Sequence, residues 1–76
     1  MAYTDRIELN PKVYNDKPVV RGTRIPVSVI LDQIADGDSW DNIIIGYPEL
    51  NREDIQAAIL YASSLVEHTD IIVANA

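Results

Sequence analysis

The apolar spacing of residues 51–67 constrains the fold most strongly. Apolar residues recur there at helical intervals, as Ile55, Ala58, Ile59, Ala62, Leu65 and Val66. Asn51 occupies the N-cap position, and Asp54 follows three residues later at the capping-box position. A stripe with this period forms one face of an amphipathic helix. The sequence therefore predicts a long helix whose apolar face packs against other elements.

Two shorter helices are predicted before it. The first spans residues 27–35, where apolar residues recur at i, i+3, i+4, i+7 and i+8, with Pro26 at its start and Gly37 after its end. The second spans residues 39–46. Ser39 is its expected N-cap, and its apolar stripe consists of Trp40, Ile43 and Ile44.

The N-terminal third has the pattern of extended structure. Ile7 and Leu9 alternate with charged residues, which is the period of a half-buried strand. Val19 and Val20, and then residues 23–25, are β-prone and are separated by Arg21 and Gly22. We therefore expect a small β-ribbon, confined to edge positions because Pro18 and Pro26 cannot donate ladder hydrogen bonds.

These elements predict a single domain over residues 1–76. It is mainly α with a small β-ribbon: an N-terminal β-hairpin (5–26), a three-helix bundle (27–68) and a C-terminal arm or strand (69–76). A chain this short buries only about 60% of its unfolded surface. It has no cysteine and one histidine, so neither disulfides nor a histidine cluster supports the core. We expect a partner or oligomer to do so.

Charge and composition narrow the functional classes. Up to Val27 the chain has five cations and three acids, a net of +2. From Ser28 onward there are nine acids and one cation, Arg52, a net charge of −8. The two parts add up to the net charge of −6 of the chain. A nucleic-acid contact is therefore expected in the first third. We find no signal peptide, no apolar run of membrane-spanning length and no phosphate-binding loop. The chain is expected to be cytoplasmic and non-catalytic, with no metal, cofactor or small-molecule ligand.

Three stretches carry a family resemblance. They are "DKPVVRGTRIPV" (16–27), "ADGDSWDNII" (35–44) and "YPELNREDIQAAILYA" (47–62). Together they resemble the "domain of unknown function 433" family, and the similarity covers residues 5–62. The departure from the family pattern is at Trp40, Asp41 and Asn42, where two glutamates are usual, and in the extra apolar Ile45.

The resemblance implies a homeodomain-like module whose helix-turn-helix comprises residues 39–46 and 51–67. It also implies an antitoxin-like partner of a PIN-like ribonuclease toxin. The leading hypothesis is accordingly a partner module that dimerises and binds such a toxin, with autoregulatory DNA binding as an addition. The alternative is a stand-alone helix-turn-helix transcriptional regulator that binds DNA.

Four residues are the candidates for DNA contact: Arg21, Arg24, Arg52 and Gln56. Arginine suits guanine and glutamine suits adenine in the major groove. Against this, Glu53 and Asp54 lie in the first turn of the same helix, where they would repel phosphate. For Arg21 and Arg24 two interpretations stay open: a phosphate contact, or ion pairs that join the ribbon to the acidic helices.

A second apolar face on the third helix predicts a partner or dimer interface. It consists of Ala57, Leu60 and Tyr61, with Ser64 small enough to join them. A helix that is apolar on two sides is buried on both or meets a partner. Further candidates for the interface are Ile45, Tyr47, Ile71, Ile72 and Val73. A β-ribbon covering this face of the helix, or a tail folded on its own chain, remain the alternatives.

Overall fold

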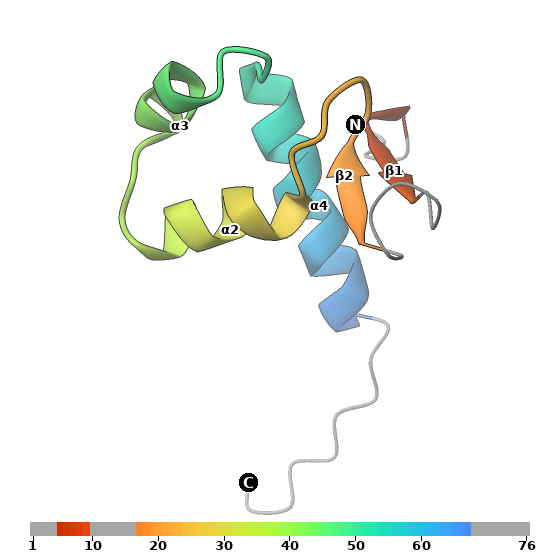
Figure 1. Cartoon of the computed structure of the whole chain (residues 1–76). Helices are drawn as coiled ribbons and strands as arrows, with labels where there is room; N and C mark the ends of the chain where they lie inside the picture. Colours follow the sequence, from red (N-terminus) through yellow and green to blue (C-terminus); the bar gives the residue numbers. More distant parts are fainter. Residues whose placement is uncertain (1–4, 10–16, 68–76) are drawn as a thin grey trace, which may run out of the picture.

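The structure, a computed structural model, describes residues 5–9 and 17–67. It contains a β-hairpin followed by three helices (Figure 1), which confirms the predicted fold. The elements are β1 (Ile7–Leu9), β2 (Pro18–Val20), α2 (Val27–Ala35), α3 (Trp40–Gly46) and α4 (Arg52–Glu67). The predicted C-terminal arm or strand at residues 69–76 lies outside the described residues.

The hairpin pairs β1 with β2, in antiparallel register. Ile7 lies opposite Val20, and Leu9 lies opposite Pro18. The sequence also suggested that residues 23–25 form a strand of the ribbon. They form the end of a tight turn instead, in which the Val20 N–H donates to the Ile25 carbonyl at 3.0 Å. The next residue, Pro26, makes an isolated bridge with Val19 of β2.

The turn after β2 is shaped by two residues of the arginine-rich stretch. Gly22 has a φ of +82°, a backbone conformation that a Cβ would penalise. The Thr23 hydroxyl donates to the Val20 carbonyl at 2.8 Å and accepts from the Ile25 N–H at 3.0 Å. Glycine and threonine between Arg21 and Arg24 are thus explained by the local backbone, as expected for the glycine.

The ends of the two short helices follow their sequence signals. Gly37 has a φ of +92°. Its N–H donates to the Ile34 carbonyl, and the Asp38 N–H donates to the Gln33 carbonyl, each at 3.0 Å. This is a Schellman motif, which ends α2 and satisfies its last carbonyls. Ser39 caps α3 as predicted, because its Oγ accepts from the Asn42 N–H at 3.1 Å.

The core lies where α4 meets α2, α3 and β1. Each of these elements, together with β2 and the loops before α2 and α4, contributes apolar side chains to it. The buried cluster consists of Ile7, Val20, Ile25, Val27, Ile30, Ile43, Leu50, Ile55, Ala57 and Ala58. Burial at roughly 25 cal/mol per Å² of apolar surface makes this cluster the main source of stability.

The start of α4 carries a complete capping box. The Asp54 N–H donates to Asn51 Oδ1 at 2.9 Å, and the Asn51 N–H donates to Asp54 Oδ2 at 3.0 Å. This reciprocal pair satisfies backbone donors that a helix start leaves without partners. Both residues were predicted in these positions from the sequence.

Arg6 joins the hairpin to this capping box. Its guanidinium donates to Asp54 Oδ1 at 3.0 Å and to Asn51 Oδ1 at 3.4 Å. The Asp54 side chain is 10% exposed and that of Arg6 35%, so the carboxylate is largely buried and the guanidinium is partly exposed. For Arg21 and Arg24, ion pairs between the ribbon and the helices were one of two interpretations from the sequence. Arg6, which immediately precedes β1, makes such a link.

We predict that Asp54→Ala lowers the free energy of unfolding by about 2 kcal/mol, because it removes the acceptor of the Asn51 N–H and leaves the partly exposed Arg6 without its carboxylate. The matched control is Glu53→Ala, at an exposed position in the same helical turn, which should change stability by less than about 0.5 kcal/mol. Urea unfolding measures both. Equal effects of the two substitutions would contradict the role given to Asp54.

Candidate partner-binding surface

The last helix extends past the elements that cover its first half. α4 has 16 residues and α2 has 9, which correspond to about 24 Å and about 14 Å. In Figure 1 the C-terminal end of α4 continues beyond both α2 and the hairpin. The apolar stripe of α4 is therefore buried at Ile55 and Ala58 but exposed at Ile59 (36%), Leu65 (52%) and Val66 (67%).

This exposed half of α4 also lacks charge. No charged residue occurs from position 56 to position 66, in a chain of which 24% is charged. A solvated helix face normally carries charged and polar side chains. Apolar exposure without charge is instead the composition of a surface that another molecule covers. We name this part of the molecule, residues 59–66, the α4 surface.

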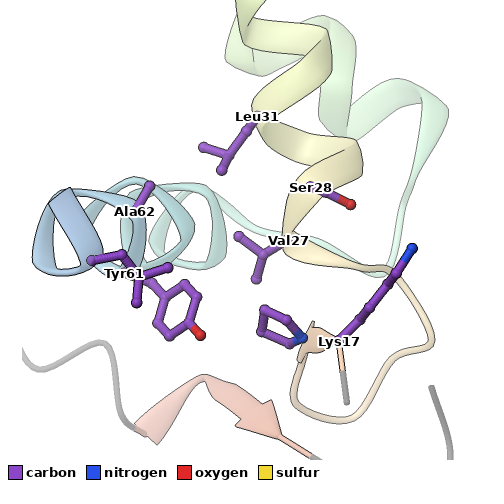
Figure 2. Close-up of a pocket in the computed structure, with 8 residues that line it drawn as sticks. Lys17, Val27, Ser28, Leu31, Tyr61 and Ala62 are labelled. Atoms are coloured by element: carbon purple, nitrogen blue, oxygen red, sulfur yellow. The ribbon is translucent and has the colours of Figure 1, made fainter. Parts of the chain in front are cut away.

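A groove adjoins the α4 surface (Figure 2). It has a volume of about 320 Å³, is open to solvent, and lies between the start of β2, α2 and the second half of α4. Val27 and Leu31 of α2 point toward Tyr61 and Ala62 of α4. The remaining lining residues are Lys17, Pro18, Ser28 and Leu65.

The groove is apolar despite the lysine at its edge. Figure 2 shows that the ammonium group of Lys17 points away from Tyr61 and the centre of the groove. The hydroxyls of Ser28 and Tyr61 are the other polar side-chain groups of the lining. Such a groove suits apolar side chains, with hydrogen bonding at its rim.

The predicted second apolar face of α4 is only partly at the surface. Tyr61 lines the groove and packs against the core, and Leu60 and Ser64 are half-buried. Ala57 is 0% exposed, so its assignment to a partner surface is corrected. The physical reason is that the core surrounds the first half of α4 on more sides than one stripe, because β1, α2 and α3 all contact this helix.

The other predicted interface residues lie elsewhere. Ile45 is 77% exposed on α3, which Figure 1 places far from the C-terminal end of α4. Tyr47, just after α3, is half-buried against the core. Ile71, Ile72 and Val73 lie outside the described residues. The structure therefore unites Tyr61 with the groove, but not Ile45 or Tyr47.

Sequence reasoning placed Leu65, Val66 and Ile59 in the core stripe and so missed their exposure. One sequence signal was sufficient to find it: residues 51–67 predict a helix nearly twice as long as residues 27–35. A 9-residue helix cannot cover a stripe that runs the length of a 16-residue helix. The surplus length ends up outside the core.

The DNA-contact candidates lie toward one end of the molecule. The Arg21 N–H donates to the Arg6 carbonyl at 2.7 Å, and Arg6 in turn bonds Asn51 at the start of α4. The turn with Arg21 and Arg24 is thus linked by two hydrogen bonds to the helix start that carries Arg52. Both turn arginines, Arg52 and Gln56 are exposed.

Arg52 has intramolecular partners on α3. Its guanidinium donates to Asp41 Oδ1 at 3.1 Å and lies 4.9 Å from the centre of the Trp40 ring. Trp40 and Asp41 occupy the positions where the sequence departs from the usual pattern, so the departure has a structural role. A base contact by Arg52 would have to replace both interactions.

Within residues 5–9 and 17–67, no three metal-binding side chains (His, Cys, Asp or Glu) lie close enough together to form a metal site. No helix in the same part of the chain is long and apolar enough to cross a membrane.

Fold and surface together define a small three-helix domain with an N-terminal hairpin and a last helix whose residues 59–66 are uncharged and partly exposed. The profile of the family described as "Protein of unknown function (DUF433)" matches residues 7–62. The chain belongs to this family. The resemblance noted in the sequence is therefore confirmed.

Two known proteins are similar to this chain. The chain is 36% identical over 63 residues to the "Uncharacterized protein y4eO" of Sinorhizobium fredii, a match that covers 83% of this chain and 28% of the relative. It is also similar to the crystal structure of a DUF433 member protein from Anabaena variabilis, with a TM-score of 0.76 and 31% identity. That match covers 82% of this chain and 61% of the other.

We predict that Arg52→Ala alters the fluorescence emission of Trp40, the only tryptophan of the chain. Stability should fall by less than about 1 kcal/mol, because both partners of this ion pair are solvent-exposed. Arg24→Ala, a second exposed arginine, is the control and should leave the emission spectrum unchanged. An unchanged spectrum for Arg52→Ala would show that the stacking does not persist in solution.

Proposed function

We propose that this chain is a non-catalytic, antitoxin-like module that binds a PIN-like toxin through its groove and the α4 surface. The observation that carries the proposal is the uncharged, apolar second half of α4, exposed beside an apolar groove. The toxin as partner comes from the family resemblance. The geometry supports a protein partner of some kind.

Burial of apolar side chains would supply most of the affinity. Tyr61 and Leu65 border the groove, and tyrosine is one of the residue types that contribute most of the binding energy at protein interfaces. Leu65 is 52% exposed, so it has apolar area left to bury. Lys17 and Ser28 lie in the lining as well, where they can hydrogen-bond at a polar rim.

A stand-alone DNA-binding regulator is the second candidate. The observation in its favour is that the turn with Arg21 and Arg24 is linked to the helix start with Arg52 and Gln56. Two features oppose it. Arg52 is paired with Asp41, and the exposed Glu53 in the same turn repels phosphate. We therefore rank DNA binding second, as an addition to partner binding.

We predict that Leu65→Asp abolishes a complex with the product of the neighbouring gene, obtained by co-expression and measured by co-purification. An aspartate would place a charge where the partner buries apolar surface, at a cost of at least about 2 kcal/mol of binding free energy. Gln56→Asp adds the same charge to an exposed position of α4 that lies outside both the α4 surface and the groove lining. It should leave the complex intact.

Three outcomes of this experiment would contradict the proposal. The wild-type chain could fail to co-purify with the neighbouring product. Leu65→Asp could retain the complex, or Gln56→Asp could lose it. Circular dichroism of each variant shows whether α4 is still folded, so a loss of binding is separated from a loss of structure.

The two candidate functions predict different behaviour toward duplex DNA. A regulator should bind its own promoter in preference to an unrelated duplex, and Arg52→Ala should remove that preference. We expect instead that the chain by itself binds both duplexes equally weakly and that moderate salt abolishes binding. An electrophoretic shift assay at several salt concentrations decides between them. Promoter preference that survives moderate salt would favour the regulator.

A further inference from the structure

We propose that two copies of this chain pair through α4, as antiparallel helices that cross at Ala62. The proposal rests on the proposed function, since it takes the α4 surface as a protein interface, and it identifies a second copy as one occupant. The interface is the side of α4 that carries Ile59, Ala62 and Val66, which we name the α4 seam.

The spacing along α4 supports a helix as the covering element. Ile55, Ile59, Ala62 and Val66 are separated by four, three and four residues, the alternation of a helix-pairing seam. Ile55 is fully buried within its own chain, whereas Ile59 is 36% and Val66 is 67% exposed. The seam therefore continues the core stripe out to the end of the helix. A second helix with the same spacing extends that packing without a change of period.

A two-fold arrangement suits the order of side-chain sizes along the seam. Ala62, the smallest side chain, lies between Ile59 and Val66. If two antiparallel helices cross at Ala62, their backbones can approach closely there. Ile59 of each copy then lies beside Leu65 and Val66 of the other, so large side chains flank the close contact on both sides. The same surface is used by both copies, as two-fold symmetry requires.

Charge favours this location for a chain of net charge −6. Two such chains repel each other wherever their acidic surfaces meet. Residues 56–66 carry no charge, so contact along the α4 seam does not place like charges of the two copies side by side. Of the acids that border this run, Asp54 is buried and paired with Arg6, and Glu67 lies at the end of the helix.

The pairing leaves most of the groove available. Ala62 and Leu65 line the groove and also lie in the paired surface, but Val27, Leu31 and Tyr61 line the groove and are not part of the seam. A pair of chains would therefore present two grooves. The toxin and the second copy bind neighbouring parts of α4. A substitution at Val66, which is not in the groove lining, changes the seam and leaves the groove lining as it is.

A cysteine at the crossing point tests the arrangement directly. The chain has no cysteine, so Ala62→Cys carries a single thiol. Since a disulfide requires Cα atoms within about 7 Å, mild oxidation should give a covalent dimer of about twice the 8.5 kDa chain mass. Ser63→Cys, one position along and exposed, is the matched control and should remain mainly monomeric. Equal cross-linking of the two variants would overturn the crossing at Ala62.

The mass of the unmodified chain gives the second readout. Sedimentation equilibrium should show a dimer for the wild type and a monomer for Val66→Glu, whose exposed position allows a charge without loss of the core. A wild-type monomer at all concentrations, or a dimeric Val66→Glu, would overturn the proposal. A monomer that still co-purifies with its neighbouring gene product would refute the pairing alone. A dimer without that partner would refute the proposed toxin binding alone.

Discussion

The ion pair between Arg6 and Asp54 fastens the two parts of this fold together. Asp54 belongs to the capping box that starts α4, and Arg6 stands immediately before β1, 48 positions earlier in the chain. The Arg6 carbonyl also accepts from the Arg21 N–H, which holds the turn after β2. Hairpin, turn and last helix thus share one set of hydrogen bonds. Because the Asp54 carboxylate is largely buried and needs a partner, these contacts hold the start of α4 against the hairpin.

That position divides α4 into two halves with different roles. The first half supplies Ile55, Ala57 and Ala58 to the core, where β1, α2 and α3 surround it. The second half extends beyond them with the same apolar spacing, and it has no charged residue before Glu67 at its end. In a small domain with a thin core, exposed apolar surface of this kind is costly in water. Coverage by a partner chain offsets that cost, which is how stability and proposed function are connected.

Much of the fold could be predicted because its signals are local. Ser39, the pair of Asn51 and Asp54, and Gly37 mark helix ends through bonds to backbone groups only a few residues away. The candidate site depends on contacts between distant segments. Three features depend on which elements lie beside α4 and how far each extends: the burial of Ala57, the exposure of Leu65, and the ion pair of Arg6 with Asp54. Periodicity gives the face of a helix but not the length that its neighbours cover.

We propose that the second half of α4 is a binding surface, whereas its first half holds the core together. Amide hydrogen exchange, measured for the chain alone and with the co-expressed product of the neighbouring gene, tests this most directly. We expect the complex to slow exchange in the second half of α4, residues 59–67, and in residues 27–31 beside the groove. The first turn of α4 and the turn at residues 21–24 should exchange as before. Slower exchange in the first turn of α4 and at residues 21–24, with exchange in the second half of α4 unchanged, would contradict this assignment of the binding surface.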